Sequence, residues 1–229
     1  DVWERRELLG MLVSRNLKIR YKSSVLGFFW SFLAPVLMIV TYGLFARILR
    51  FSDQHPRYLQ FLVVGVVIWQ FLLMCLNDSL HSIMGNVNLV KRTAFPRIIL
   101  PLSTILANFV NFALTLLVLT AFLLLAHMSF DHLIWLPAVI LTHTALCLGT
   151  GLLISTSNVF LRDTEHLLSV GTLAWFFLTP IVYAPEFQYT LIPAGWRWAT
   201  FLNPMTGLVS AYRSIFIDDP VQPLSWIAV

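Results

Sequence analysis

The sequence predicts an all-α polytopic membrane protein. Hydrophobic residues make up 58% of the 229 residues and charged residues only 11%, whereas soluble domains carry about 25% charged residues. The apolar residues gather in long runs near residues 25–46, 59–76, 98–126, 134–159 and 167–184. These runs are continuously apolar and lack the alternation of a membrane β-strand, so each is expected to form a helix.

Each run approaches the length that a helix needs to cross a bilayer. A hydrocarbon core of about 30 Å and a rise of about 1.5 Å per residue together require about 20 residues. The chain begins at Asp1 rather than at a methionine, and an apolar stretch runs from Pro223 to its end at Val229. We therefore expect six spans, five of them complete, in a single transmembrane domain over residues 1–229 that is truncated at both ends.

The basic residues indicate which side of the membrane each loop occupies. With a cytoplasmic N-terminus, ten Lys and Arg residues fall in inside segments and five in outside segments. Inside loops carry the excess of positive charge in membrane proteins, so this ratio favours a cytoplasmic N-terminus. Because the basic residues cluster beside the apolar runs, the net charge of +4 indicates a membrane surface rather than nucleic acid.

The first predicted element is an amphipathic helix over residues 3–22. Leu9, Val13 and Leu17 share one of its faces. A helix of this kind lies along the cytoplasmic headgroups with its apolar side down. Two interpretations fit it, a basic anchor beside the membrane or an anchor that also docks a partner. Its second face carries the basic residues Arg15, Lys18 and Lys22.

Polar and small residues mark the third and fourth runs. The fourth run contains the small residues Ala145, Gly149, Gly151 and Ser155, which predict close packing between helices. A polar stripe in the third run predicts either hydrogen bonds between helices or a strip that faces a translocation path. This stripe consists of Thr104, Asn108, Asn111 and Thr115.

The longest external stretch covers residues 184–223. Its prolines include Pro185, Pro193 and Pro204, and its apolar part from Thr206 to Ile217 is too short to cross a bilayer. Short apolar segments bounded by prolines on one side of a membrane are typical of interfacial or re-entrant helices. We therefore expect such helices before the sixth span.

No catalytic or metal-binding pattern stands out, so we expect neither enzymatic activity nor a bound cofactor or metal in this chain. The segment from Gly85 to Lys91 lacks the glycine that precedes the lysine of a Walker A loop, and metal-binding pairs such as Cys-x-x-Cys are absent from the sequence.

No acidic residue lies inside the predicted spans. Ion-coupled carriers commonly keep one, so this absence indicates that another subunit supplies the energy.

The loop from Asn86 to Arg97 combines basic and apolar residues with Pro96. It lies between the second and third runs, on the predicted cytoplasmic side. A short element that is fixed to a span at each end is suited to transmit the movement of a soluble partner into the membrane. The alternative is a positively charged anchor without a partner.

Short motifs follow one another along nearly the whole chain. They are Tyr21-Lys-Ser-Ser-Val-Leu-Gly27 with Trp30, Phe61-Leu-Val-Val-Gly65 with Trp69, Asn86-Val-Asn-Leu-Val-Lys91 with Phe95-Pro-Arg97, Pro101-Leu-Ser103, Phe160-Leu-Arg-Asp163, Leu178-Thr-Pro180, and Leu202-Asn-Pro-Met205 with Tyr212-Arg213. Together they resemble ABC-2 type permeases that export bacterial polysaccharides such as O-antigen, teichoic acid and capsule.

This resemblance implies an ABC-2, type V exporter-like fold with six spans. It implies an interfacial helix at residues 3–22, a cytoplasmic coupling helix at 86–97 and external re-entrant or gate helices at 186–217. It also implies a homodimer in the bacterial cytoplasmic (inner) membrane, working with two copies of a separate cytoplasmic ABC ATPase that binds ATP and Mg.

The resemblance and the demands of a polymer channel assign three groups of residues. The residues expected to couple to the ATPase are Arg15, Lys18, Lys22, Asn86, Asn88, Leu89, Lys91, Arg92, Phe95, Arg97, Arg162 and Asp163. A path for sugars is expected to have aromatic faces and few charges, and its candidate residues are Phe28, Phe32, Asn108, Asn111, Trp175 and Tyr183. The candidate external gate residues are Trp196, Trp198, Asn203, Tyr212 and Arg213.

The predicted function is the membrane subunit of an ATP-driven exporter of a lipid-linked polysaccharide, O-antigen first among the cargoes. Three alternatives stay open at this point. They are an ion-coupled flippase for lipid-linked sugars, an ABC-2 exporter of a small hydrophobic molecule, and a membrane transferase. A transferase would need acid–base groups that the sequence does not assemble from His127, Asp131, His132 or Glu165.

Overall fold

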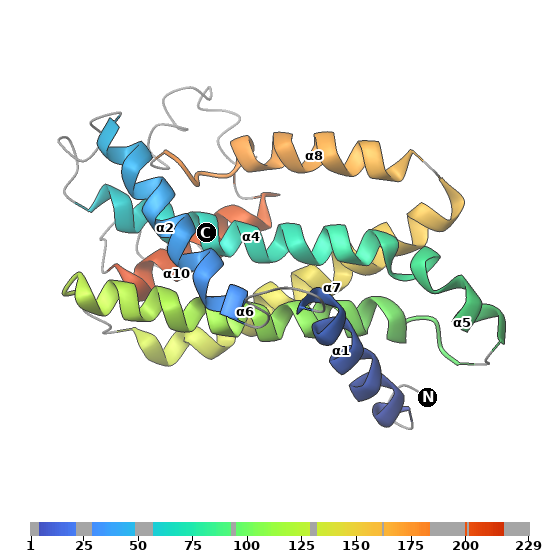
Figure 1. The fold of residues 1–229 in the computed structure, drawn as a ribbon. Helices are drawn as coiled ribbons and strands as arrows, with labels where there is room; N and C mark the ends of the chain where they lie inside the picture. Colours follow the sequence, from blue (N-terminus) through green and yellow to red (C-terminus); the bar gives the residue numbers. More distant parts are fainter. Residues whose placement is uncertain are drawn as a thin grey trace. The chain divides into compact units, whose positions relative to one another are not determined.

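The computed structural model describes residues 5–21, 29–48, 57–92, 95–128, 132–161, 163–183, 200 and 202–217, and this part of the chain contains helices and no strand (Figure 1). The longer helices are α1 (Arg6–Tyr21), α2 (Trp30–Ile48), α4 (Tyr58–Ser82), α6 (Ile99–Leu125), α7 (Leu136–Phe160), α8 (Thr164–Leu178) and α10 (Pro204–Phe216). The short helical segments are η2 (Met84–Asn86), α5 (Val87–Arg92) and η3 (Leu133–Trp135). The predicted all-α class is therefore confirmed.

Three helices in the described residues are long and apolar enough to cross a membrane. They cover Tyr58–Ser82, Ile99–Leu125 and Leu133–Phe160. The first and fifth predicted runs also contain helices, α2 and α8, but the apolar part of α2, Trp30–Phe45, is shorter, and α8 has only 15 residues. Three of the five expected spans thus meet the length requirement, and the total of six stays a prediction.

Proline and asparagine explain where α8 ends and α10 begins. Pro180 has no backbone N–H and its ring clashes with the preceding turn, so α8 stops at Leu178 rather than near residue 184 as predicted. Pro204 occupies the first turn of α10, and the side chain of Asn203 accepts a hydrogen bond from the backbone N–H of Met205. The short apolar helix predicted near 206–217 is confirmed as α10, which has 13 residues.

The contacts within the chain divide it into two compact units. Unit 1 consists of residues 1–31, 71–114 and 142–172, and unit 2 of residues 32–70, 115–141 and 173–229. Helices α2, α4, α6, α7 and α8 each contribute residues to both units.

The core of unit 1 is formed by α4, α6 and α7. Phe71 of α4 stacks on Phe112 of α6 with ring centroids 4.2 Å apart, and His143 of α7 meets both rings edge-on. Cys75 and Cys147 are free thiols and fully buried in the same unit. His143 and both cysteines are therefore packing residues of unit 1.

Small residues allow α7 to approach its neighbours in unit 1. A Cβ atom added to Gly151 would lie 2.8 Å from Ser79 Oγ and 3.0 Å from Ile105 Cδ1. Gly149 has no heavy atom within 4 Å of the same added position, so it faces away from these helices. The predicted stripe of small residues therefore packs through Gly151 and the buried Ser155, and Gly149 takes no part.

The core of unit 2 surrounds the first half of α4. Residues 61–69 are all buried, with exposed fractions of 8% or less for the bulky side chains. The face of α10 that contains Met205, Val209, Tyr212 and Phe216 is also buried. A continuous apolar segment buried on all sides is expected of a central helix rather than a lipid-facing one.

Candidate functional site

An apolar cluster in unit 1 joins α1, α5 and the start of α6. Leu12 of α1 is 5% exposed and packs with Ile99 and Leu100 of α6. Leu89 of α5 and Phe95 of the following loop pack against the same three residues. The sequence predicted that α1 lies on lipid through Leu9, Val13 and Leu17. The structure packs Leu9 against this cluster, and the contact with lipid stays a prediction. Leu8, Leu9 and Val90 complete this α1–α5 cluster.

Polar side chains reinforce the contact between α1 and the predicted coupling element. Arg15 Nη2 donates a hydrogen bond to Asn86 Oδ1 at 2.8 Å, and Asn86 Nδ2 donates to the carbonyl of Ser82 at 2.8 Å. Asn16 Nδ2 donates to Ser103 Oγ at 3.3 Å, which connects α1 to α6. Two of the predicted coupling residues, Arg15 and Asn86, are thus bound to each other and hold α1 beside η2.

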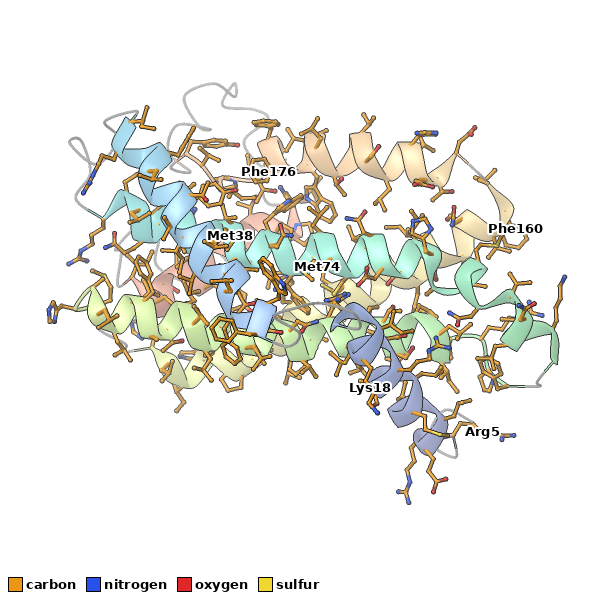
Figure 2. All side chains as sticks on the ribbon, viewed as in Figure 1. Arg5, Lys18, Met38, Met74, Phe160 and Phe176 are labelled. Atoms are coloured by element: carbon orange, nitrogen blue, oxygen red, sulfur yellow. The ribbon has the colours of Figure 1, made fainter. Side chains whose placement is uncertain are left out.

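The other predicted coupling residues divide into packed and exposed groups. Leu89 and Phe95 lie in the α1–α5 cluster, whereas Lys18 extends from α1 (Figure 2). The structure leaves Lys22 and Arg162 outside the described residues, together with the side chain of Arg92. A polar exposed surface with an apolar interior is what a docking element requires. The exposed members are Lys18, Asn88, Lys91, Arg97 and Asp163.

A charged group lies where α1 meets α4 and α6 in unit 1. Arg20 forms an ion pair with Asp78 and also donates to Asn108 Oδ1 at 2.7 Å. Asn108 Nδ2 in turn donates to Asp78 Oδ2 at 2.8 Å. The predicted second run stopped before Asp78, but α4 continues to Ser82, and Arg20 and Asn108 bind the Asp78 carboxylate within this last part of the helix. Asn108, a candidate path residue, therefore bonds to neighbouring helices, as the alternative interpretation of the polar stripe expected.

We expect Asp78→Ala to lower the free energy of unfolding by about 1 kcal/mol. Hydrogen bonds to charged groups contribute about 1.5–3 kcal/mol, and the side chains of Arg20 and Asp78 are 29% and 40% exposed, which weakens the pair. Thermal unfolding of the solubilised protein measures the change, with exposed Asn77→Ala as the control. If Asp78→Ala lowers the free energy of unfolding as much in the Arg20→Gln variant as in the unaltered protein, the ion pair does not contribute to stability.

An aromatic group in unit 2 contains one of the predicted path residues. Trp69 of α4 meets Trp175 and Phe176 of α8 edge-on, with ring centroids 5.9 Å and 5.6 Å apart. Trp69 is 5% exposed, whereas Trp175 and Phe176, the latter labelled in Figure 2, are half-buried. Partly open aromatic faces of this kind are suited to stacking on sugar rings.

The remaining candidate path residues lie in different surroundings. Tyr183 OH donates to the carbonyl of Phe177 at 2.7 Å, and Phe32 of α2 is half-buried. Asn111 is 7% exposed and lies within unit 1. Phe28 is outside the described residues.

Asn203, a predicted gate residue, connects α8 to α10. Its Oδ1 accepts hydrogen bonds from Trp175 Nε1 at 2.8 Å and from the backbone N–H of Met205 at 3.1 Å. Its Nδ2 donates to Thr179 Oγ1 at 3.0 Å and to the carbonyl of Leu178 at 3.4 Å. One amide therefore caps α10, holds the indole of Trp175 and binds the end of α8.

The other predicted gate residues are buried or undescribed. Tyr212 is fully buried and lies parallel to the ring of Phe216, and Arg213 is 5% exposed. Trp196 and Trp198 lie outside the described residues. Nowhere in the described ranges do three His, Cys, Asp or Glu side chains gather as a metal site would require.

The helical fold, the three span-length helices and the α1–α5 cluster define an integral membrane protein with a structured basic surface. The family model of the ABC-2 type transporter matches residues 7–217. The chain therefore belongs to the ABC-2 type transporter family, as the short motifs predicted, and it is a membrane permease.

Individual relatives support the same assignment. The chain is 33% identical over 215 residues to the "O-antigen export system permease protein RfbA" of Klebsiella pneumoniae, covering 93% of this chain and 81% of the relative. It is 30% identical over 242 residues to a protein of the same name from Myxococcus xanthus, covering 100% of this chain and 90% of the relative. A second Klebsiella pneumoniae protein of that name is 32% identical over 216 residues, with coverage of 93% and 81%.

Three residues of these sites were not given a role from the sequence. Asp78 directly follows an apolar run, and a lone acid at the end of a span is a signal for a polar contact. Gly65 interrupts a run of bulky residues in α4, which indicates close approach of another group. Tyr58 gave no signal, because its partner, the carbonyl of Val182, is 124 residues away.

Proposed function

We propose that this chain is the membrane subunit of an ATP-driven exporter that moves a lipid-linked polysaccharide, O-antigen first among the candidates, across the bacterial cytoplasmic membrane. The observation that carries the proposal is the similarity to relatives named as O-antigen export permeases, over 81–90% of their length. Two copies of the permease would form the path, with the N-terminus in the cytoplasm.

In the proposed transporter, two copies of a cytoplasmic ABC ATPase bind ATP and Mg and drive the movement. Their contact would be the exposed side of α5 with Asn88 and Lys91, assisted by Lys18 of α1. The α1–α5 cluster supports this assignment, because apolar packing behind the exposed residues resists local deformation and passes a displacement on to α6. ATP can bias the permease only if the nucleotide-bound and free ATPases contact this surface differently.

Reconstitution tests the proposed energy source and cargo together. The permease and its ATPase are placed in liposomes with lipid-linked O-polysaccharide, and polymer that reaches the opposite side is measured by enzymatic digestion. We expect transport that requires hydrolysable ATP and persists when the proton gradient is collapsed. Transport that follows the proton gradient while ATP is present would support an ion-coupled flippase instead. Transport of small hydrophobic molecules but not of the polymer would exclude polysaccharide as the cargo.

Charge reversal at Lys91 is expected to weaken ATPase docking. Lys91 is exposed on α5, so Lys91→Glu removes a favourable charge from the proposed contact without disturbing the α1–α5 cluster. Truncating one partner of a buried charge pair at an interface costs about 2–5 kcal/mol, and a peripheral one less, so we expect co-purification of the ATPase to fall about tenfold or more. Arg47→Glu is the matched control, since loop charges predict that exposed Arg47 lies on the opposite side. Equal recovery of ATPase with both variants would contradict the docking role.

A further inference from the structure

The turn that follows α8 presents a row of backbone carbonyls to side chains from other helices. Because Pro180 interrupts the helix, the carbonyls at this end lack the donors of a continuing helix. Arg213 donates hydrogen bonds to two of these carbonyls. Its Nη1 lies 2.6 Å from the carbonyl oxygen of Pro180, and its Nη2 lies 2.7 Å from that of Ile181. Tyr58 OH donates to the carbonyl of Val182 at 2.9 Å.

Arg213 of α10 is also bound to α4. Its Nε and Nη2 lie 3.3 Å and 3.1 Å from the carbonyl oxygen of Phe61, and its Cζ lies 3.3 Å from the centroid of the Phe61 ring. The guanidinium thus binds three carbonyl groups and one aromatic face at once. Only a planar fork with several donors can do this, so lysine could not reproduce the arrangement.

Gly65 makes room for the guanidinium. A Cβ atom on this residue would lie 2.7 Å from Arg213 Nη2 and 3.3 Å from both Cγ2 and the carbonyl oxygen of Ile181. The first distance is too short for any real contact, so a side chain at residue 65 must displace the guanidinium. Glycine is therefore favoured here by the approach of Arg213 rather than by backbone conformation.

Within unit 2, Arg213 connects elements that are far apart in the sequence. We call Arg213, Gly65, Phe61, Pro180 and Ile181 the Arg213 cluster. Hydrogen bonds from a charged donor are stronger than those between neutral groups, yet all of these acceptors are neutral carbonyls. Water or sugar hydroxyls could replace these carbonyls one at a time as acceptors for Arg213, so the cluster is stable but its hydrogen bonds can be exchanged.

We propose that the Arg213 cluster holds the outer end of the permease closed between transport cycles, with Arg213 as a positioning residue. The inference rests on the proposed function and on the expectation, from the family resemblance, that residues 186–217 form external gate helices. Opening for a polymer then requires the guanidinium to leave the carbonyls of Pro180 and Ile181, which releases α10 from α4 and from the turn after α8.

The test measures leak through the closed transporter. The complete permease–ATPase complex is reconstituted in liposomes that contain a small fluorescent dye, and release is followed without ATP or polymer. Loss of a hydrogen bond to a charged group changes an equilibrium by roughly tenfold or more, so we expect Gly65→Ala and Arg213→Lys each to raise leak by about tenfold. Gly149→Ala, which meets open space, is the matched control and is expected to leave leak unchanged.

Combining the two substitutions shows whether they act on the same contact. Gly65→Ala harms the cluster by displacing Nη2, an atom that Arg213→Lys already removes, so the double variant should leak no more than Arg213→Lys alone. Additive leak, or leak from Gly65→Ala no greater than from Gly149→Ala in an intact complex, would overturn the proposal.

A measurement on the unaltered complex covers the case in which a variant does not assemble. Hydrogen exchange of the backbone amides in residues 179–183 and 205–217 should increase together when ATP and lipid-linked polysaccharide are added. Unchanged exchange there, with transport under way, overturns the proposed opening. If the transporter does not move the polymer but the leak pattern holds, the cargo is wrong and the role of Arg213 stands.

Discussion

Gly151→Val is expected to produce the largest loss of stability of any single substitution considered, about 3 kcal/mol or more. The side chain would meet Ser79 Oγ at 2.8 Å and Ile105 Cδ1 at 3.0 Å from its first atom alone. Both neighbours are fully buried on α4 and α6, so neither can turn toward solvent. Inserting a side chain into a close-packed core forces helices apart, and unit 1 has no free space for the added atoms on this side of α7.

The matched control for this prediction lies two residues away. Gly149→Val changes the same residue type on the same helix but meets no atom within 4 Å, so its effect is expected to be small. Thermal unfolding of the purified protein in detergent compares the two variants. Equal losses of stability would mean that helix propensity, and not the approach of Ser79 and Ile105, explains why residue 151 is glycine.

The second large effect is expected for Asn203→Ala. Alanine removes the cap of α10, which contributes about 1 kcal/mol, and it leaves Trp175 Nε1 without the acceptor seen in the structure, which costs about 1–3 kcal/mol. We therefore expect the free energy of unfolding to fall by about 2–4 kcal/mol. Export should also fall, because the indole of Trp175 loses its fixed orientation beside Trp69.

Asn203→Asp separates the contribution of the amide oxygen from that of the amide nitrogen. Aspartate keeps an acceptor for Met205 and Trp175 but loses the donor to Thr179 and Leu178, so an intermediate stability is expected. Thermal unfolding and export in a strain that lacks its own O-antigen permease measure both effects. Leu202→Ala, at an exposed neighbour, is the control. An Asn203→Asp protein no more stable than Asn203→Ala would show that the acceptor contributes nothing.

The sequence predicted the helical elements well because apolar runs report directly on burial and bilayer length. Each of the five runs contains a helix, and the short helix before the predicted sixth span is present as α10. The end of α8 was misplaced by several residues, although Pro180 was visible. The apolar run continues past Pro180, but the helix stops where the backbone N–H is missing.

The site could be predicted only in part, because its contacts join residues that are distant in the chain. The loop around Lys91 was recognisable from its charge, but the pairing of Arg20 with Asp78 joins residues 58 apart and leaves no local pattern. Gly149 and Gly151 look alike in the sequence, and only the positions of α4 and α6 distinguish them. Asn203 was predicted to be a gate residue, but its bond to Trp175 was not foreseen.

The α1–α5 cluster bears on the exchange of segments between related permeases. Leu12, Leu89 and Leu100 come from three separate stretches of chain, and their shapes must match one another. A chimera that takes only its basic loop from a relative would place foreign side chains against a native α1, leaving voids or collisions. With the docking role proposed above, swapping the first helix and the loop as a pair, with the opening turn of α6, is the combination that should preserve assembly while transferring the choice of ATPase.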